Sequence, residues 1–209
     1  MELALFPVTL IIIVVTVLLS IRAFNDADVK YKWVYYPYKL KRNNEWYRTF
    51  SHLFIHGDYM HLFFNMFVLF SFGEMMEVSF VLEYGSVLGH IHFFLLYFLG
   101  GLAATLWPFI RNVDNPNYMS LGASGAVSAV LFASILWYPQ GGIYLMFIPV
   151  EIPAWLFGFI YLGFEYYMSK RGGTGIAHDA HFGGAVFGIA YILFINFDKG
   201  KAFFTYIFS

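Results

Sequence analysis

Two side chains have types and surroundings suited to nucleophilic chemistry, Ser124 and His181. Ser124 stands in the small-residue run Leu121–Ala126, which begins an apolar segment that continues to about Tyr138. A serine at the start of a helix is accessible on one side and lies near backbone N–H groups that have no partner within the helix. Ser124 could therefore act as a nucleophile. Small residues also let membrane helices pack closely, and for Ser124 taken alone this structural interpretation is favoured.

A hydroxyl nucleophile needs a base within hydrogen-bond reach, and histidine is the usual one. His181 begins another apolar segment and is followed closely by Gly184 and Gly188. These two glycines form a small-xxx-small pair that would let this helix approach the Ser124 helix closely. No acidic third member is evident, because Asp179 would lie about 160° around the helix from His181. The pattern favours a Ser–His dyad over a triad.

Acyl transfer also needs hydrogen-bond donors for the oxyanion that develops on the substrate carbonyl. His61 and Asn65 are four residues apart on one helical face and could supply them together with the backbone N–H of Ser124. Each has a structural alternative, since an intramembrane asparagine often joins helices and a histidine near a helix start is often interfacial. The residues alone leave both alternatives open.

The composition indicates what must position these residues. Hydrophobic residues make up 60% of the 209-residue chain and charged residues only 12%. A soluble domain with so few charges would aggregate, so a polytopic membrane protein is predicted. The net charge of -1 and the lack of a large basic block argue against nucleic acid as a partner. The absence of cysteine excludes disulfides, thiol nucleophiles and thiolate metal sites.

Six apolar stretches approach the roughly 20 residues that a bilayer requires, which predicts an all-α, six-span bundle forming one domain over residues 1–209. The first stretch lacks a positive flank and a clear cleavage site, so we expect a retained helix rather than a signal peptide. The predicted spans are 5–23, 60–80, 90–109, 121–138, 152–168 and 177–197. By parity the second, fourth and sixth spans begin on the same side of the membrane. This arrangement places His61, Ser124 and His181 at one face.

Several motifs in the expected order resemble the rhomboid family of intramembrane serine proteases. They are Gly122-Ala123-Ser124-Gly125 for the family's Gly-x-Ser-Gly, Ala180-His181-Phe182-Gly183-Gly184 for its Ala-His-x-Gly-Gly, His61 with Asn65 for its His-x-x-x-Asn, and Trp46 with Arg48 for its first-loop Trp-Arg signature. His52, His56 and Glu77 match further common positions. The resemblance covers the whole predicted six-span core.

The resemblance implies a protease that cuts membrane-spanning protein substrates near the bilayer surface, without metal or cofactor. Ser124 would be the nucleophile and His181 the general base and acid, while His61 and Asn65 would complete the oxyanion hole. The fifth span would move aside as a lateral gate. A multi-pass protein of the bacterial plasma membrane is expected. One departure is Ser128, which stands where the family often has an aromatic ring stacked on the catalytic histidine.

Other functions fit the sequence less well. A rhomboid-like protein that binds or escorts membrane clients without cutting them would have no need for the four site residues together. A small ion or metal transporter would depend on histidines such as His52 and His56, but no His-Glu-x-x-His motif is present, and no metal site is predicted. Intramembrane acids can mark a proton path, yet Glu77 and Glu165 lie near helix ends, where a structural carboxylate is the favoured interpretation.

The charge distribution conflicts with the orientation that the resemblance implies. Of the twelve lysines and arginines, all but Lys199 and Lys201 lie on the predicted catalytic side. The positive-inside rule would place that side in the cytoplasm. Bacterial members of the family usually have it outside, and we expect the outside orientation.

Overall fold

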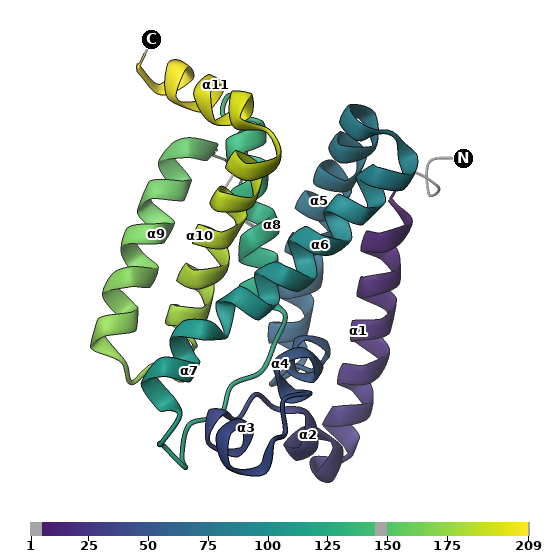
Figure 1. Cartoon of the computed structure of the whole chain (residues 1–209), viewed down its shortest axis with the longest axis vertical. Helices are drawn as coiled ribbons and strands as arrows, with labels where there is room; N and C mark the ends of the chain where they lie inside the picture. Colours follow the sequence, from purple (N-terminus) through teal and green to yellow (C-terminus); the bar gives the residue numbers. More distant parts are fainter. Residues whose placement is uncertain (1–5, 145–149, 209) are drawn as a thin grey trace.

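The computed structural model describes residues 6–144 and 150–208. Leu5, at which the first predicted span begins, lies outside the described residues. Six helices make up the body of the molecule (Figure 1). They are α1 (Pro7–Asn25), α5 (Tyr59–Tyr84), α6 (Ser86–Ala104), α8 (Ser124–Trp137), α9 (Ala154–Arg171) and α10 (His178–Ile195). The largest departure from the predicted boundaries is in the third stretch, where α6 ends at Ala104 and α7 (Leu106–Asn112) follows.

Four of these helices are long and apolar enough to cross a bilayer, namely α1, α5, α6 with its continuation α7, and α10. With 14 residues, α8 is shorter than the roughly 20 that a straight crossing needs. The 18 residues of α9 include three charged side chains, Glu165, Lys170 and Arg171. The chain is thus an all-α, multi-pass membrane protein with four candidate spans, and the count of six stays a prediction.

The central element is α8, whose residues from Gly125 to Trp137 are all buried. It packs against α5, α6, α9 and α10. The approach of α10 is especially close, because a Cβ added at Gly184 or Gly188 would overlap the backbone around Gly125 or Ala129 of α8. This close approach confirms the packing role predicted for the two glycines.

Short helices cover one end of the bundle, where α7 also lies (Figure 1). They are α2 (Ala27–Trp33), α3 (Pro37–Asn43), α4 (Arg48–Ser51) and the 3-10 turn η2 (His52–Phe54). Arg48 is buried and organises this loop, because its Nη1 donates to the carbonyl oxygens of Tyr31 and Val34. A backbone bridge between Tyr35 and Ser120 then joins the loop to the segment that leads into α8.

The opposite end carries elements that the sequence analysis does not predict. Strands β1 (Gly142–Tyr144) and β2 (Glu151–Pro153) pair antiparallel between α8 and α9, with Ile143 opposite Ile152. The chain continues after α10 into a further helix, α11 (Phe197–Phe208), which bends away from the bundle axis (Figure 1).

Candidate active site

Ser124 and His181 form the centre of the candidate site. Ser124 is the first residue of α8, and its Oγ lies 2.7 Å from Nε2 of His181 in the first turn of α10. The close glycine-mediated packing of α10 on α8 makes this short contact possible. The parity argument is confirmed for these two helices, since both begin at the same end of the bundle.

The segment before Ser124 is held from two sides. Gly122 has a φ of 119°, a conformation that side-chain-bearing residues rarely adopt, and its N–H donates to the carbonyl oxygen of His52 at 3.0 Å. The N–H of Ala123 donates to Nε2 of His56 at 3.4 Å, while Nδ1 of His56 bonds Ser20 Oγ at 3.0 Å. Two buried histidines therefore fix the backbone directly ahead of the candidate nucleophile.

Burial explains why these histidines can act as neutral groups. It lowers the pKa of His52 to about 4 and the pKa of His56 to about 3. His56 is further disfavoured as a cation by the nearby ring of His61. At neutral pH the unprotonated Nε2 of His56 can accept the Ala123 N–H, as the geometry requires.

His61 and Asn65 lie on the first turns of α5 and line one cavity of about 640 Å³ together with Ser124 and His181. Nδ1 of His61 accepts the N–H of Gly57 at 3.4 Å, which leaves the proton of the neutral ring on Nε2. That side of the ring faces Gly122, since a Cβ added to Gly122 would lie 2.9 Å from His61 Nε2. Nδ2 of Asn65 donates to the carbonyl oxygen of His61 at 2.9 Å. All four predicted site residues thus share one cavity.

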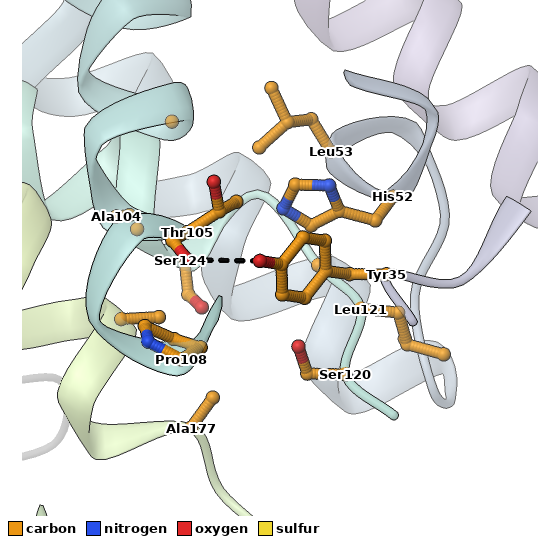
Figure 2. Close-up of a pocket in the computed structure, with 14 residues that line it drawn as sticks. Tyr35, His52, Leu53, Ala104, Thr105, Pro108, Ser120, Leu121, Ser124 and Ala177 are labelled. Carbon is orange, nitrogen blue, oxygen red and sulfur yellow. Dashed lines mark hydrogen bonds between the residues drawn. The ribbon is translucent and has the colours of Figure 1, made fainter. Parts of the chain in front are cut away.

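A second, much smaller cavity is lined in part by Ser124 (Figure 2). Its volume of about 20 Å³ is enough for roughly one water molecule. Tyr35, His52 and Ser120 are among the residues that line it, and the Tyr35 hydroxyl donates to the carbonyl oxygen of Thr105 at 2.9 Å. The first loop thus contributes polar groups to the environment of the candidate nucleophile.

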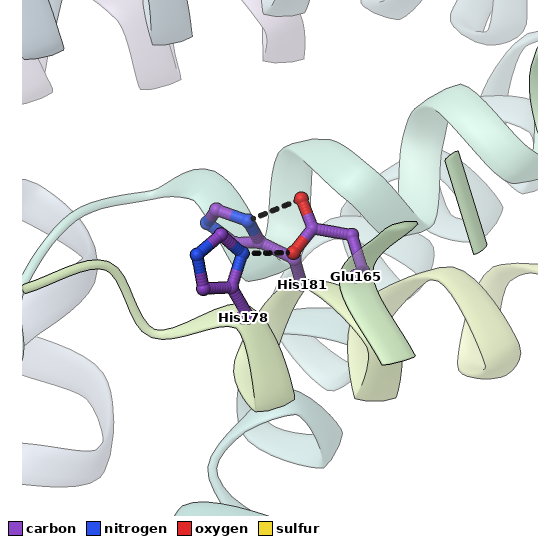
Figure 3. A group of neighbouring side chains, drawn as sticks. All are labelled: Glu165, His178 and His181. Carbon is purple, nitrogen blue, oxygen red and sulfur yellow. Dashed lines mark hydrogen bonds and ion pairs between the residues drawn. The ribbon is translucent and has the colours of Figure 1, made fainter. Parts of the chain in front are cut away.

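Glu165 of α9 also contacts the candidate base. One carboxylate oxygen lies 3.1 Å from Nδ1 of His181 and the other lies 2.6 Å from Nδ1 of His178 (Figure 3). The sequence analysis assigned Glu165 a structural role and missed these contacts. The signal that could have found them is the short connection between the fifth and sixth spans, which places the end of one beside the start of the other.

Ser128, which replaces the aromatic residue common in the family, contacts a tyrosine of α9. Its Oγ lies 3.0 Å from the hydroxyl of Tyr161 on α9, and this hydroxyl also lies beside the Glu165 carboxylate. Tyr161 therefore joins Ser128 to the Glu165 carboxylate, and a hydrogen bond to that carboxylate orients the His181 ring.

The donor atoms of Glu165, His178 and His181 lie within 4.8 Å of one another and form the one group of metal-ligating type found among the described residues. Nδ1 of each histidine faces its own oxygen of Glu165, and each Nε2 faces a hydroxyl, that of Thr174 or Ser124. Hydrogen bonding accounts for the arrangement without a metal. His52 and His56 lie outside this group, and both have protein partners.

The fold and site define a multi-pass membrane protein with a serine–histidine pair at the start of two packed helices. Residues 43–196 match the Rhomboid domain family model, and the chain belongs to the rhomboid family. It is 31% identical over 158 residues to RHOMBOID-like protein 12, mitochondrial, of Arabidopsis thaliana, covering 71% of this chain and 45% of that protein.

Two further relatives extend the comparison. The chain is 31% identical to the presenilin-associated rhomboid-like protein, mitochondrial, of Bos taurus, over 70% of this chain and 36% of that protein. It is 29% identical to Rhomboid protein 1, mitochondrial, of Saccharomyces cerevisiae, over 68% of this chain and 40% of that protein. The matched regions span less than half the length of each of these relatives.

Proposed function

We propose that this protein is an intramembrane serine endopeptidase that cleaves membrane-spanning segments of protein substrates. The observation that carries the proposal is the 2.7 Å contact between Ser124 Oγ and His181 Nε2, within a cavity that His61 and Asn65 also line. A nucleophile in contact with its base, beside candidate oxyanion donors, is the arrangement that acyl transfer needs.

The reaction follows from the placement of these atoms. Nε2 of His181 takes the Ser124 hydroxyl proton as Oγ attacks the scissile carbonyl carbon. Nε2–H of His61, the amide of Asn65 and the first backbone N–H groups of α8 stabilise the resulting oxyanion. His181 then gives the proton to the leaving amine, which leaves an acyl-enzyme on Ser124. Water that enters through the cavity shared by Ser124 and His181 hydrolyses this ester with His181 again as base, and the proton returns to Ser124 Oγ. The proposal includes no metal or cofactor.

The surroundings of the cavity support a membrane-embedded substrate. Met60, Phe64 and Ile176 line the cavity beside the polar site residues, and all three are exposed. On α9, Phe159 and Ile160 are also exposed. A substrate segment arriving from the lipid beside α5 would meet the apolar side chains that line the cavity before it reached Ser124. The lateral gate expected at the fifth span stays a prediction.

The names of the relatives bear on which membrane holds the protein. The relatives named above are mitochondrial proteins by name, which does not support the expected bacterial plasma membrane. The proposal therefore specifies a multi-pass protein acting on membrane-spanning substrates and no particular compartment.

Cleavage by purified protein tests the proposal. Wild type, Ser124→Ala and His181→Ala are reconstituted with a fluorogenic single-span substrate, and Ser134→Ala serves as a matched control on α8. We expect the two site variants to lose about 10³-fold or more in kcat, whereas Ser134→Ala keeps its activity. Cleavage that persists in Ser124→Ala would overturn the mechanism. Binding of the substrate without cleavage by folded wild type would favour the client-binding alternative.

A further inference from the structure

We propose that Glu165 is a positioning residue for the reaction, so that Ser124, His181 and Glu165 act as a triad in place of the predicted dyad. This inference rests on the proposed function. It begins from a continuous hydrogen-bonded chain in which His181 Nε2 faces Ser124 Oγ and His181 Nδ1 faces the Glu165 carboxylate.

The two contacts of His181 determine which ring nitrogen carries the proton. A carboxylate only accepts hydrogen bonds, so Nδ1 must carry the proton that Glu165 accepts. Nε2 is then free to take the proton of Ser124. Glu165 therefore holds the ring in the tautomer and orientation that a base requires.

The fold holds the carboxylate itself in place. Gly172, Gly173 and Gly175 all have positive φ angles in the short connection from α9 to α10, which lets the chain reverse so that Glu165 faces the first turn of α10. His178 bonds the second carboxylate oxygen at 2.6 Å, and its own Nε2 bonds Thr174 Oγ1 at 3.0 Å. With both oxygens engaged, the Glu165 side chain has little freedom to rotate.

The charge environment of Glu165 favours a role in the transition state. The carboxylate is buried, and among the described residues its ion-pair partners are His178 and His181, with no lysine or arginine. A full positive charge arrives beside it when His181 takes the proton of Ser124. A buried carboxylate without a permanent cation thus stabilises the imidazolium of the transition state more than the neutral ring of the resting enzyme.

The test compares Glu165→Gln and Glu165→Asp with wild type, measuring kcat and KM in the reconstituted cleavage assay and the unfolding temperature. Glu77→Gln is the control, because Glu77 is an equally buried glutamate that bonds a histidine, His90, at the other end of the bundle. We expect kcat of Glu165→Gln to fall by about 100-fold or more with KM changed by less than about threefold. Glu165→Asp should recover about tenfold of that loss, since it keeps the charge. Glu77→Gln should lower the unfolding temperature and leave kcat unchanged.

The outcomes separate this inference from the proposed function. Wild-type cleavage that Ser124→Ala abolishes and Glu165→Gln retains would overturn the role of Glu165 alone. Absence of cleavage by folded wild type would overturn both. A proton NMR spectrum of folded wild type at low temperature, after fluorophosphonate inhibition, does not depend on the variants folding. It should show a far-downfield His181 Nδ1–H resonance, and a folded protein without that resonance would contradict the triad.

Discussion

At the scale of single residues, the candidate site depends on two buried histidines that stay neutral, His52 and His56. His56 accepts the Ala123 N–H and bonds Ser20, while His52 bonds the carbonyl oxygen of Arg48 through Nδ1. The His56 ring and the backbone carbonyl of His52 join the first loop to the segment before Ser124. Because neither ring has room for a hydration shell, a proton added to either ring would be costly.

The lowered pKa values of these two histidines predict that the protein loses stability in acid. Their folded pKa values, about 4 for His52 and about 3 for His56, lie below the unfolded value of 6.5. The stabilisation is fully present above pH 6.5 and is lost as the pH falls from 6.5 toward the folded values, because only the unfolded chain takes up the proton. For His56 the loss is about 2 kcal/mol at pH 5.

The unfolding temperature of detergent-solubilised protein between pH 8 and pH 5 checks this prediction. It should fall with pH in wild type, and the slope should be smaller in His56→Gln, whatever the starting stability of that variant. An identical slope in both proteins would show that His56 is not responsible.

The residue scale also shows what the sequence could and could not predict. Ser124, His181, His61 and Asn65 stand in short motifs at the starts of three predicted spans, so parity predicted that they lie at one face of the membrane. Glu165 is in no motif, and its role depends on how α9 rotates about its own axis and on the turn from Gly172 to Gly175. Neither feature can be predicted from hydrophobic periodicity, because α9 is apolar on several faces.

At the scale of elements, the packing of α10 against α8 sets the geometry of the candidate site. Gly184 meets the carbonyl group of Gly125, one residue after Ser124, and Gly188 meets that of Ala129 one turn further along α8. Because Ser124 and His181 lie on these two helices, any change in the separation of the helices changes the contact between the candidate nucleophile and the candidate base.

A single methyl group should therefore disrupt the site. Gly184→Ala places a Cβ against the Gly125 carbonyl oxygen, and we expect it to cost about 1–3 kcal/mol of stability and most of the activity. Gly163→Ala on α9 is the matched control, because a Cβ there has no neighbour within 4 Å. It should keep activity and change stability by less than about 1 kcal/mol. Thermal unfolding and cleavage of both variants measure the difference, and equal effects would argue against close packing as the cause.

The same scale shows what apolar composition could and could not predict. The helix α8 was predicted as a span from its apolar character, and its residues from Gly125 to Trp137 are buried by other helices. Apolar composition cannot distinguish burial by lipid from burial by protein. The helix α11 was missed because Phe197–Phe208 mixes charged and apolar residues at a density well below that of a spanning segment.

At the scale of the whole molecule, one end differs chemically from the other. The end that holds the candidate site carries the first loop, α7 and nearly all of the lysines and arginines, including Arg111, whose Nη1 donates to the carbonyl oxygen of Ser169. The other end carries α11 with Lys199, which lies 4.3 Å from the centre of the Trp137 ring. Charge and family resemblance therefore make opposite predictions for the orientation of the protein in a membrane.

Reporter fusions after Arg111 and after Lys201 in a bacterial host decide between the two orientations. We expect the fusion after Arg111 to report the outside and the fusion after Lys201 the cytoplasm. A cytoplasmic reporter after Arg111 would show that the positive-inside rule prevails in this protein.

The central claim is that Ser124 is a nucleophile activated by His181. The most direct measurement is to treat the folded, reconstituted protein with a fluorophosphonate and to map the adduct by peptide mass spectrometry. The account predicts a single adduct on Ser124 that is absent from Ser124→Ala and strongly reduced in His181→Ala, while Ser134→Ala labels like wild type. No adduct on folded wild type, or an adduct on a different serine, would contradict it.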